Sequence, residues 1–318
     1  MNLVKRKSFQ TVRKTFWKNY GSLFGLAGIC LILTLLSDRF MTVPNLVNIT
    51  RQVSINAIIA VGMTLVILTG GIDLSVGSLV ALTGCVAIMG MDLPGGDFTG
   101  IVLGLAVAAG AGLLSGVLVA YCSMPPFITT LAMLTIARGV ALVITSGQPL
   151  VRFNSAYQFL GEGQVGPVPV PILIMVLVLL LAWFILKNTP LGSYIYATGG
   201  NEEAARLSGI KVKRVKTLVY SLSGVCAGIS GLVLAARLGS AQPNTGNGFE
   251  LDAIAAVVLG GTSLMGGRGT IWGTLIGAFI IGVLNNGFNL LDVSPYYQLI
   301  AKGGVIIFAV LLDQFLKR

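Results

Sequence analysis

The chain contains no histidine and few charged residues of either sign. Only 10% of its 318 residues are charged, against about 25% in an average soluble domain. Hydrophobic residues make up 55%, and the mean hydropathy is +0.89. The four cysteines, Cys30, Cys85, Cys122 and Cys226, lie in apolar segments without a CxxC pair. This composition predicts an integral membrane protein in which the cysteines are small core residues.

Several functional motifs are also missing. The sequence has no G-x-S-x-G turn, no H-E-x-x-H helix and no cluster of metal-ligating residues, which leaves little for catalysis to use. It has no phosphate-binding loop, and "GRGTIW" places Trp272 where a dinucleotide fingerprint needs glycine. The net charge of +10 is not carried by a soluble fold that could present it to phosphates. We therefore expect no enzyme activity, no cofactor and no nucleic-acid partner.

The apolar residues group into ten segments, each a candidate membrane helix. The sequence thus predicts an all-α polytopic membrane helix bundle with about ten transmembrane helices. Two of the segments are short for about 30 Å of hydrocarbon, so broken or re-entrant helices are expected among them. The ten segments are 21–37, 52–70, 77–93, 99–122, 126–147, the short 171–186, 217–236, the short 252–266, 270–290 and 298–315.

Basic residues are distributed unequally between the loops. If the N-terminus is cytoplasmic, 15 of the 21 Lys and Arg lie in inside segments, and only Arg39, Arg51, Arg152 and Arg237 lie in outside loops. The positive-inside rule then predicts that both termini are cytoplasmic. We expect a basic cytoplasmic tail at 1–20, followed by a single transmembrane domain at 21–318 with a long cytoplasmic loop at 187–216. The first apolar segment is too long for an ordinary signal core, so we favour an uncleaved span.

The stretch "LTGGIDLSVGSLVALTG" places Asp73 and Ser75 in an otherwise apolar run. Gly70 and Gly71 permit a turn there, after which either polar side chain could cap the next helix. Alternatively, both side chains face a solute pathway. A similar Gly-Gly interruption begins at Gly260. The two interruptions are either corresponding breaks in a repeated transporter fold or unrelated glycine-rich turns.

Four more polar residues are candidates for the pathway. Arg138 lies near the middle of its segment, where a charge requires a carboxylate partner, water or a solute. Asn285 and Asn289 lie on one helical face, beside Asn286. Their amides suit sugar hydroxyl groups but could equally bridge helices. Asn56, in segment 52–70, is a further candidate.

The long cytoplasmic loop contains "GNEEAARLSG", which predicts a short helix. Asn201 is a plausible cap, Glu202 and Glu203 complement the dipole in the first turn, and Gly209 can end the helix. Such a helix could transmit motion from a soluble motor to the bundle, or it could lie on lipid headgroups.

At "EAARLSG" the sequence resembles a known family. The stretch matches the E-A-A-x-x-x-G core of the loop with which permease subunits of bacterial ABC importers dock on their ATPase, although no Leu-Pro follows it. "AVGMTLVILTGGIDLSVGSLVALTG", "ARLGSAQPNTGNGFELDAIAAVVLGGTSLMGG" and "GVLNNGFNLL" extend the likeness from about residue 40 to the C-terminus. The chain resembles the sugar-type permeases, most of all the ribose-type members.

The resemblance implies a multi-pass protein of the bacterial inner membrane. It also implies a permease homodimer, two ABC ATP-binding subunits, a periplasmic sugar-binding protein and D-ribose as solute. The docking residues would be Asn201, Glu202, Glu203, Ala204, Ala205, Arg206 and Gly209. The outer segments 148–170 and 237–251 would either contact the sugar-binding protein or serve only as connecting loops. The main alternative is a stand-alone ion-coupled secondary sugar transporter, for which the sequence offers few buried carboxylates.

Overall fold

A computed structural model describes residues 21–152 and 155–317, and the predicted basic tail at 1–20 lies outside the described residues. Helices dominate this part of the chain, which also contains two short pairs of strands. The helices are α1 (Gly21–Leu36), α2 (Val43–Leu68), α3 (Val76–Gly90), α4 (Gly96–Ala120), α5 (Pro126–Thr145), α6 (Ser155–Glu162), α7 (Val170–Asn188), α8 (Pro190–Gly200), α9 (Glu202–Leu207), α10 (Val212–Leu238), α11 (Phe249–Leu259), α12 (Ile271–Leu290) and α13 (Pro295–Lys317). The strands are β1 (Leu150–Val151), β2 (Gln164–Val165), β3 (Val168–Pro169) and β4 (Ser240–Ala241).

Each of the ten predicted apolar segments coincides with a helix, which confirms the all-α membrane bundle. Among the described residues, six helices are long and apolar enough to cross a membrane: α2, α4, α5, α7, α10 and α12. The count of ten spans is therefore not confirmed. α11 has 11 residues and is about 16 Å long, roughly half of the hydrocarbon thickness. A broken helix was expected here, whereas α7, also expected to be short, is a full span of 19 residues.

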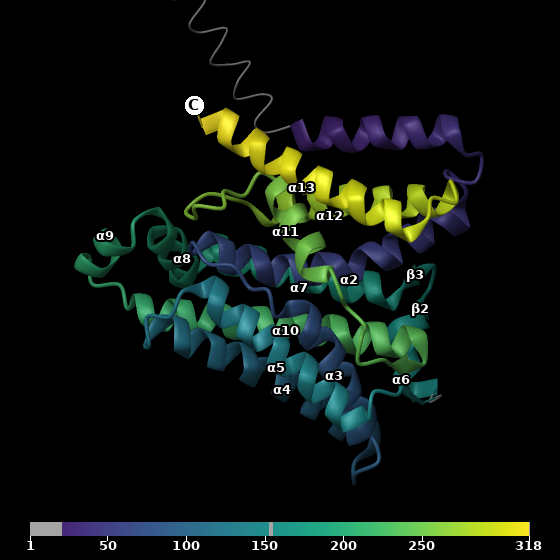
Figure 1. Cartoon of the computed structure of the whole chain (residues 1–318), viewed down its shortest axis with the longest axis horizontal. Coiled ribbons are helices and arrows are strands. Elements are labelled where there is room, and N and C mark those ends of the chain that lie inside the picture. The colour runs from purple at the N-terminus through teal and green to yellow at the C-terminus, as the bar shows by residue number, and fades with distance from the viewer. Residues whose placement is uncertain (1–20, 153–154, 318) are drawn as a thin grey trace, which may run out of the picture.

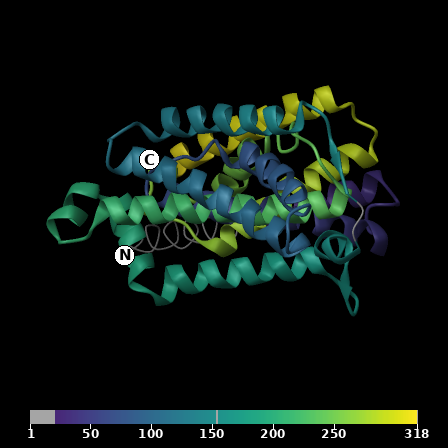
Figure 2. The same ribbon diagram turned by 90° about the horizontal axis from the view of Figure 1, so that it is seen from below.

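The long helices lie alongside one another, and the two ends of the bundle differ (Figures 1 and 2). One end carries α8 and α9, and the C-terminal end of α13 lies on this side. The opposite end carries α6 and the antiparallel hairpin of β2 and β3. The β1 and β4 strands also pair antiparallel, with Leu150 opposite Ala241. We refer below to the α9 end and the hairpin end.

α2 and α10 form the centre of the bundle, while α4, α5 and α7 cover its outside. The most apolar window of α2 is 89% buried within the chain and that of α10 is 72% buried, whereas the value for α4 and α5 is 28%. The exposed faces of the outer helices carry large apolar side chains such as Phe127 and Leu131. These faces suit contact with lipid or with another apolar protein surface.

α4 and α10 pack against each other through small residues. A Cβ atom added at Gly112 would lie 3.1 Å from the Gly224 Cα atom, and one at Gly228 would lie 2.9 Å from the Ala108 Cβ atom. The small-residue faces of the two helices therefore pack against each other, which lets their backbones approach closely.

Both Gly-Gly interruptions separate helices in the structure. α2 ends at Leu68 and α3 begins at Val76, while α11 ends at Leu259 and α12 begins at Ile271. Gly70 and Gly261 have φ values of +80° and +85°, which favour glycine at these turns.

Candidate functional site

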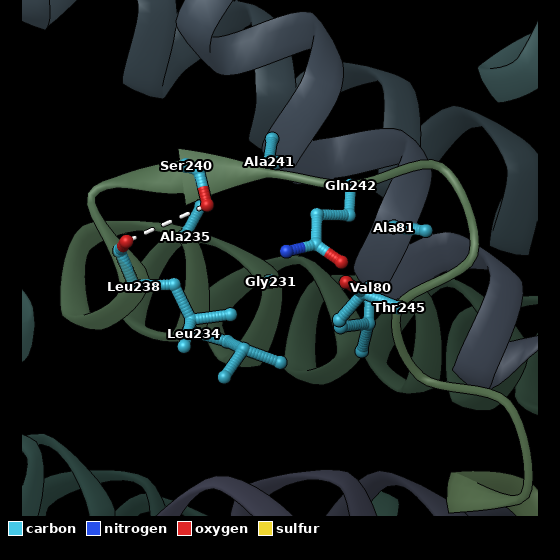
Figure 3. Close-up of a pocket in the computed structure, with 11 residues that line it drawn as sticks. Val80, Ala81, Gly231, Leu234, Ala235, Leu238, Ser240, Ala241, Gln242 and Thr245 are labelled. Carbon is cyan, nitrogen blue, oxygen red and sulfur yellow. Dashed lines mark hydrogen bonds between the residues drawn. The ribbon is translucent and has the colours of Figure 1, made fainter. Parts of the chain in front are cut away.

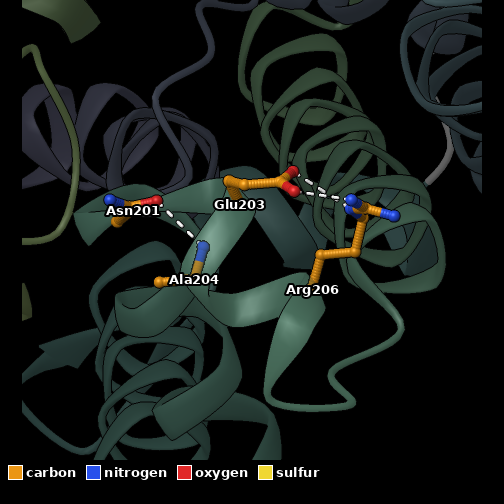
Figure 4. Close-up of polar contacts among 4 residues, drawn as sticks. All are labelled: Asn201, Glu203, Ala204 and Arg206. Atoms are coloured by element: carbon orange, nitrogen blue, oxygen red, sulfur yellow. Dashed lines mark hydrogen bonds and ion pairs between the residues drawn. The ribbon is translucent and has the colours of Figure 1, made fainter.

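The predicted loop helix is present as α9, and its first turn is capped as expected. Asn201 has an extended backbone, and its side-chain oxygen accepts a hydrogen bond of 2.9 Å from the Ala204 N–H (Figure 4). Gly209, with a φ of +84°, follows the helix and turns the chain toward α10. Segment 187–216 is therefore largely helical, because α8 precedes α9 and α10 begins at Val212.

α9 projects from the bundle and carries an internal ion pair. Two guanidinium nitrogens of Arg206 donate to the Glu203 carboxylate over 2.5 and 3.0 Å (Figure 4), and both side chains are exposed. These hydrogen bonds lower the pKa of Glu203 below its usual value. Leu207 is 75% exposed, whereas Ala205 is buried at the base of the helix. α9 thus presents a charged and partly apolar surface beyond the bundle.

Asp73 is fully buried and accepts three hydrogen bonds. One carboxylate oxygen accepts from the Ser75 N–H over 3.0 Å and from the Ser75 hydroxyl over 2.6 Å. The other accepts from the Ser223 hydroxyl of α10 over 2.8 Å. These contacts hold the turn before α3 and tie it to the centre of the bundle, but no side chain in the described part of the chain accepts a hydrogen bond from the first N–H groups of α3 itself.

Arg138, on α5, contacts backbone carbonyl groups. One guanidinium nitrogen donates to the Pro243 oxygen over 2.5 Å and to the Thr245 oxygen over 2.8 Å. A carboxylate partner was one of the expected alternatives, but within the described ranges Arg138 makes no salt bridge. Arg138 holds the segment between β4 and α11 against α5.

The asparagines of α12 lie in different environments. Asn286 exchanges two hydrogen bonds with Asn45 of α2, 2.9 and 3.1 Å long, and Asn289 accepts one of 3.1 Å from Gln298 of α13. These two amides bridge helices. The side-chain oxygen of Asn285 is buried without a hydrogen-bond partner. Asn56 is 8% exposed, within α2.

Asp73 and Ser75 share one hydrogen-bonded turn, but among the described residues no other two of the predicted pathway residues are joined by a hydrogen bond. The sequence did not single out Ser223 or Asn45, and it did not pair Asp252 with Lys302, whose side chains are 3.0 Å apart. A serine or asparagine in an apolar helix gives no signal of its partner. For Lys302, the rarity of a charge in an apolar segment was the available signal.

A small surface hollow, with room for about one water molecule, lies between α3, α10 and the segment that begins at β4 (Figure 3). Small and apolar side chains form most of its lining, and the Gln242 amide lies across it (Figure 3). Thr245, whose carbonyl binds Arg138, also lines it. None of the predicted pathway residues forms part of the lining. In the part of the chain that the structure describes, no group of three or more Asp, Glu, Cys or His side chains could hold a metal ion.

Comparison with known proteins gives one family and a consistent set of relatives. Residues 45–310 match the model of the family described as branched-chain amino acid transport system / permease component. The chain is 53% identical over 296 residues to the ribose import permease protein RbsC of Escherichia coli K12, covering 92% of each chain.

Two further relatives match over nearly their whole length. The ribose import permease protein RbsC of Bacillus subtilis is 49% identical, covering 98% of this chain and 99% of its own. The D-allose transport system permease protein AlsC of E. coli K12 is 43% identical, covering 95% and 94%. No solved structure matches the chain.

Proposed function

Because the chain belongs to the family of transport-system permease components, we propose that it is the membrane permease subunit of an ATP-driven ABC importer for a monosaccharide, with D-ribose as the solute. The names of its relatives support a sugar over an amino acid. The identity is 53% and 49% to two ribose permeases and 43% to the D-allose permease, which favours ribose within the sugar class. We propose no enzymatic step for this chain itself.

The observation that carries the proposal is the exposed helix α9. Its sequence has the E-A-A-x-x-x-G pattern, and its polar side chains are free of the bundle, apart from the 2.7 Å ion pair between Glu202 and Lys216. We propose that Asn201 and Gly209 shape this helix, that Ala205 seats it, and that Glu202, Glu203, Ala204 and Arg206 contact the ATP-binding subunit.

The proposed assembly places the α9 end in the cytoplasm of a bacterium and the hairpin end in the periplasm, across the inner membrane. Both termini would then be cytoplasmic; the C-terminal end of α13 lies on the same side of the bundle as α9 (Figure 1). Two copies of the chain would bind two ATP-binding subunits, and a periplasmic sugar-binding protein would dock on segments 148–170 and 237–251.

Among the predicted pathway residues, we propose that Arg138, Asn56 and Asn285 act near the solute. Arg138 contacts a segment that borders an open hollow, and Asn285 retains a buried oxygen that can accept a hydrogen bond. We propose that Asp73 and Ser75 instead stabilise the start of α3, and that Asn289 bridges α12 and α13.

A stand-alone ion-coupled carrier is the alternative, and the buried carboxylates argue against it. Such a carrier needs an acidic side chain that can bind and release its coupling ion. Asp73 accepts three hydrogen bonds and Asp252 is paired with Lys302. Neither of these two carboxylates is unpartnered in the described structure.

Reconstitution into liposomes separates the two functions. We expect ribose uptake only when the chain is combined with its ATP-binding subunit, a sugar-binding protein and ATP. The control is the chain alone under a proton or sodium gradient, and robust uptake there would refute the proposal. Competition by unlabelled ribose, allose and galactose then identifies the preferred solute.

A further inference from the structure

Three glycine pairs from distant parts of the sequence meet at the α9 end of the bundle. They are Gly70–Gly71, after α2; Gly199–Gly200, at the end of α8; and Gly266–Gly267, in the loop between α11 and α12. We name this meeting point the glycine junction. One backbone hydrogen bond of 3.0 Å, from the Gly267 N–H to the Leu68 carbonyl, joins two of its three parts directly.

The third part, α8, approaches both of the others too closely for any side chain. A Cβ atom at Gly199 would lie 1.8 Å from the Leu68 carbonyl oxygen and 2.6 Å from the Gly267 nitrogen. One at Gly266 would lie 3.0 Å from the Gly199 Cα atom. All of these neighbours are backbone atoms, so no side-chain rotation can relieve an overlap. Displacement of the α8 end toward these neighbours must therefore move the end of α2, the loop before α12, or both.

Other contacts strengthen the attachment of α8 to the same loop. The Tyr196 hydroxyl donates to the Gly269 carbonyl over 2.9 Å. The hydroxyl groups of Thr198 in α8 and Thr262 in the loop are buried without a partner. Buried hydroxyl groups that lack a hydrogen bond are costly. The contact between α8 and this loop therefore leaves two buried hydroxyl groups without hydrogen bonds in this conformation.

α8 is also the nearest rigid neighbour of α9, since only Asn201 separates the two helices. The ion pair of Glu202 and Lys216 also links α9 to the bundle. An ion pair whose carboxylate is 57% exposed contributes little energy. The backbone contacts of α8 are the stiffer connection, and they lead to α2, the most buried span.

We propose that Gly199 is a positioning residue for transport, through which movement of α9 reaches the ends of α2 and α12. The proposal rests on the proposed function, because it assumes that an ATP-binding subunit moves α9. In this proposal the glycine junction acts after the ATP-binding subunit docks and before α2 and α12 rearrange.

Adjacent glycines provide a matched pair of variants. Gly199→Ala introduces the overlap with the Leu68 carbonyl, whereas a Cβ atom at Gly200 has nothing within 4 Å. Both substitutions add one methyl group to the same helix end, and neither touches the exposed face of α9. The complex of permease, ATP-binding subunit and sugar-binding protein is reconstituted with each variant. Uptake, ATP hydrolysis and the amount of bound ATP-binding subunit are then measured.

We expect Gly199→Ala to lower ATP-driven uptake at least about tenfold relative to Gly200→Ala. Overpacking of this kind shifts the equilibrium between two conformations of the permease by about that factor. Binding of the ATP-binding subunit and basal ATP hydrolysis should stay near wild type. Uptake within about twofold of the Gly200→Ala variant would overturn the proposal, since that factor is only about 0.4 kcal/mol.

A milder variant decides the outcome if Gly199→Ala does not assemble. Tyr196→Phe removes only the hydroxyl that binds the Gly269 carbonyl. We expect a severalfold loss of uptake per ATP hydrolysed, with normal assembly, and an unchanged ratio would refute the proposal. Absence of ATP-driven uptake by the wild-type complex would instead refute the proposed function, so the two failures are distinguishable.

Discussion

Removal of the Ser223 hydroxyl tests the role of the buried carboxylate most directly. In the Ser223→Ala variant one oxygen of Asp73 loses its 2.8 Å hydrogen bond, while the other keeps both bonds from Ser75. A buried acceptor that loses its hydrogen-bond partner costs about 1–3 kcal/mol. Both residues are fully buried, so no bulk water replaces the hydroxyl. We therefore expect a loss of stability of about 2 kcal/mol.

The assay is thermal unfolding of the purified permease in detergent, followed by size-exclusion chromatography with fluorescence detection. A loss of this size should lower the midpoint by about 5 °C. The matched control is Ser221→Ala on the same helix, because the Ser221 hydroxyl makes only a 3.5 Å contact with the Ala109 carbonyl. In an Asp73→Ala background the effect of Ser223→Ala should largely vanish, since the two groups share one interaction. Equal midpoints for the two serine variants, or additive effects with Asp73→Ala, would refute the reasoning.

Three further predictions concern residues in other parts of the chain. Glu203→Lys reverses a charge at the exposed tip of α9. We expect this variant to insert normally but to lose ATP-driven uptake, and Glu203→Gln to be less affected. Normal uptake by the lysine variant would contradict the docking role. Arg138→Met removes two hydrogen bonds to segment 243–245, so amide hydrogen exchange there should accelerate more than in Arg138→Lys; equal exchange in both variants would contradict this. Asn286→Leu leaves the Asn45 amide without its partner and should cost about 1–3 kcal/mol in the same thermal assay, part of which the double variant with Asn45→Leu should recover.

The helical bundle and the α9 helix could be predicted from local patterns. Apolar segments mark helices without any knowledge of their neighbours, and Asn201 caps α9 through atoms only three residues apart. The start of α2 was placed nine residues too late. Its first turns contain Asn45, Asn48 and Arg51, which lower the hydropathy without ending the helix. Hydropathy measures transfer into lipid, whereas the helix boundary depends on backbone hydrogen bonds.

The partners of the polar residues could not be predicted, because each lies far away in the sequence. A carboxylate partner was one expectation for Arg138, but its hydrogen bonds go to carbonyl oxygens about a hundred residues away. Asp73 meets Ser223 across 150 positions. A sequence lists possible donors and acceptors, and only the packing of α5, α10 and their loops determines which of them are adjacent.

By itself the sequence determined that this is a membrane protein, that it is helical, where its glycine interruptions lie and to which family it belongs. Those features follow from composition, short-range hydrogen bonding and motif spacing. The tertiary structure alone decided that α8 reaches the ends of two interrupted helices, where Gly199 lies against the Leu68 carbonyl. The physical reason is that close backbone contact between remote segments depends on how the helices pack, and a glycine in the sequence does not reveal what it approaches.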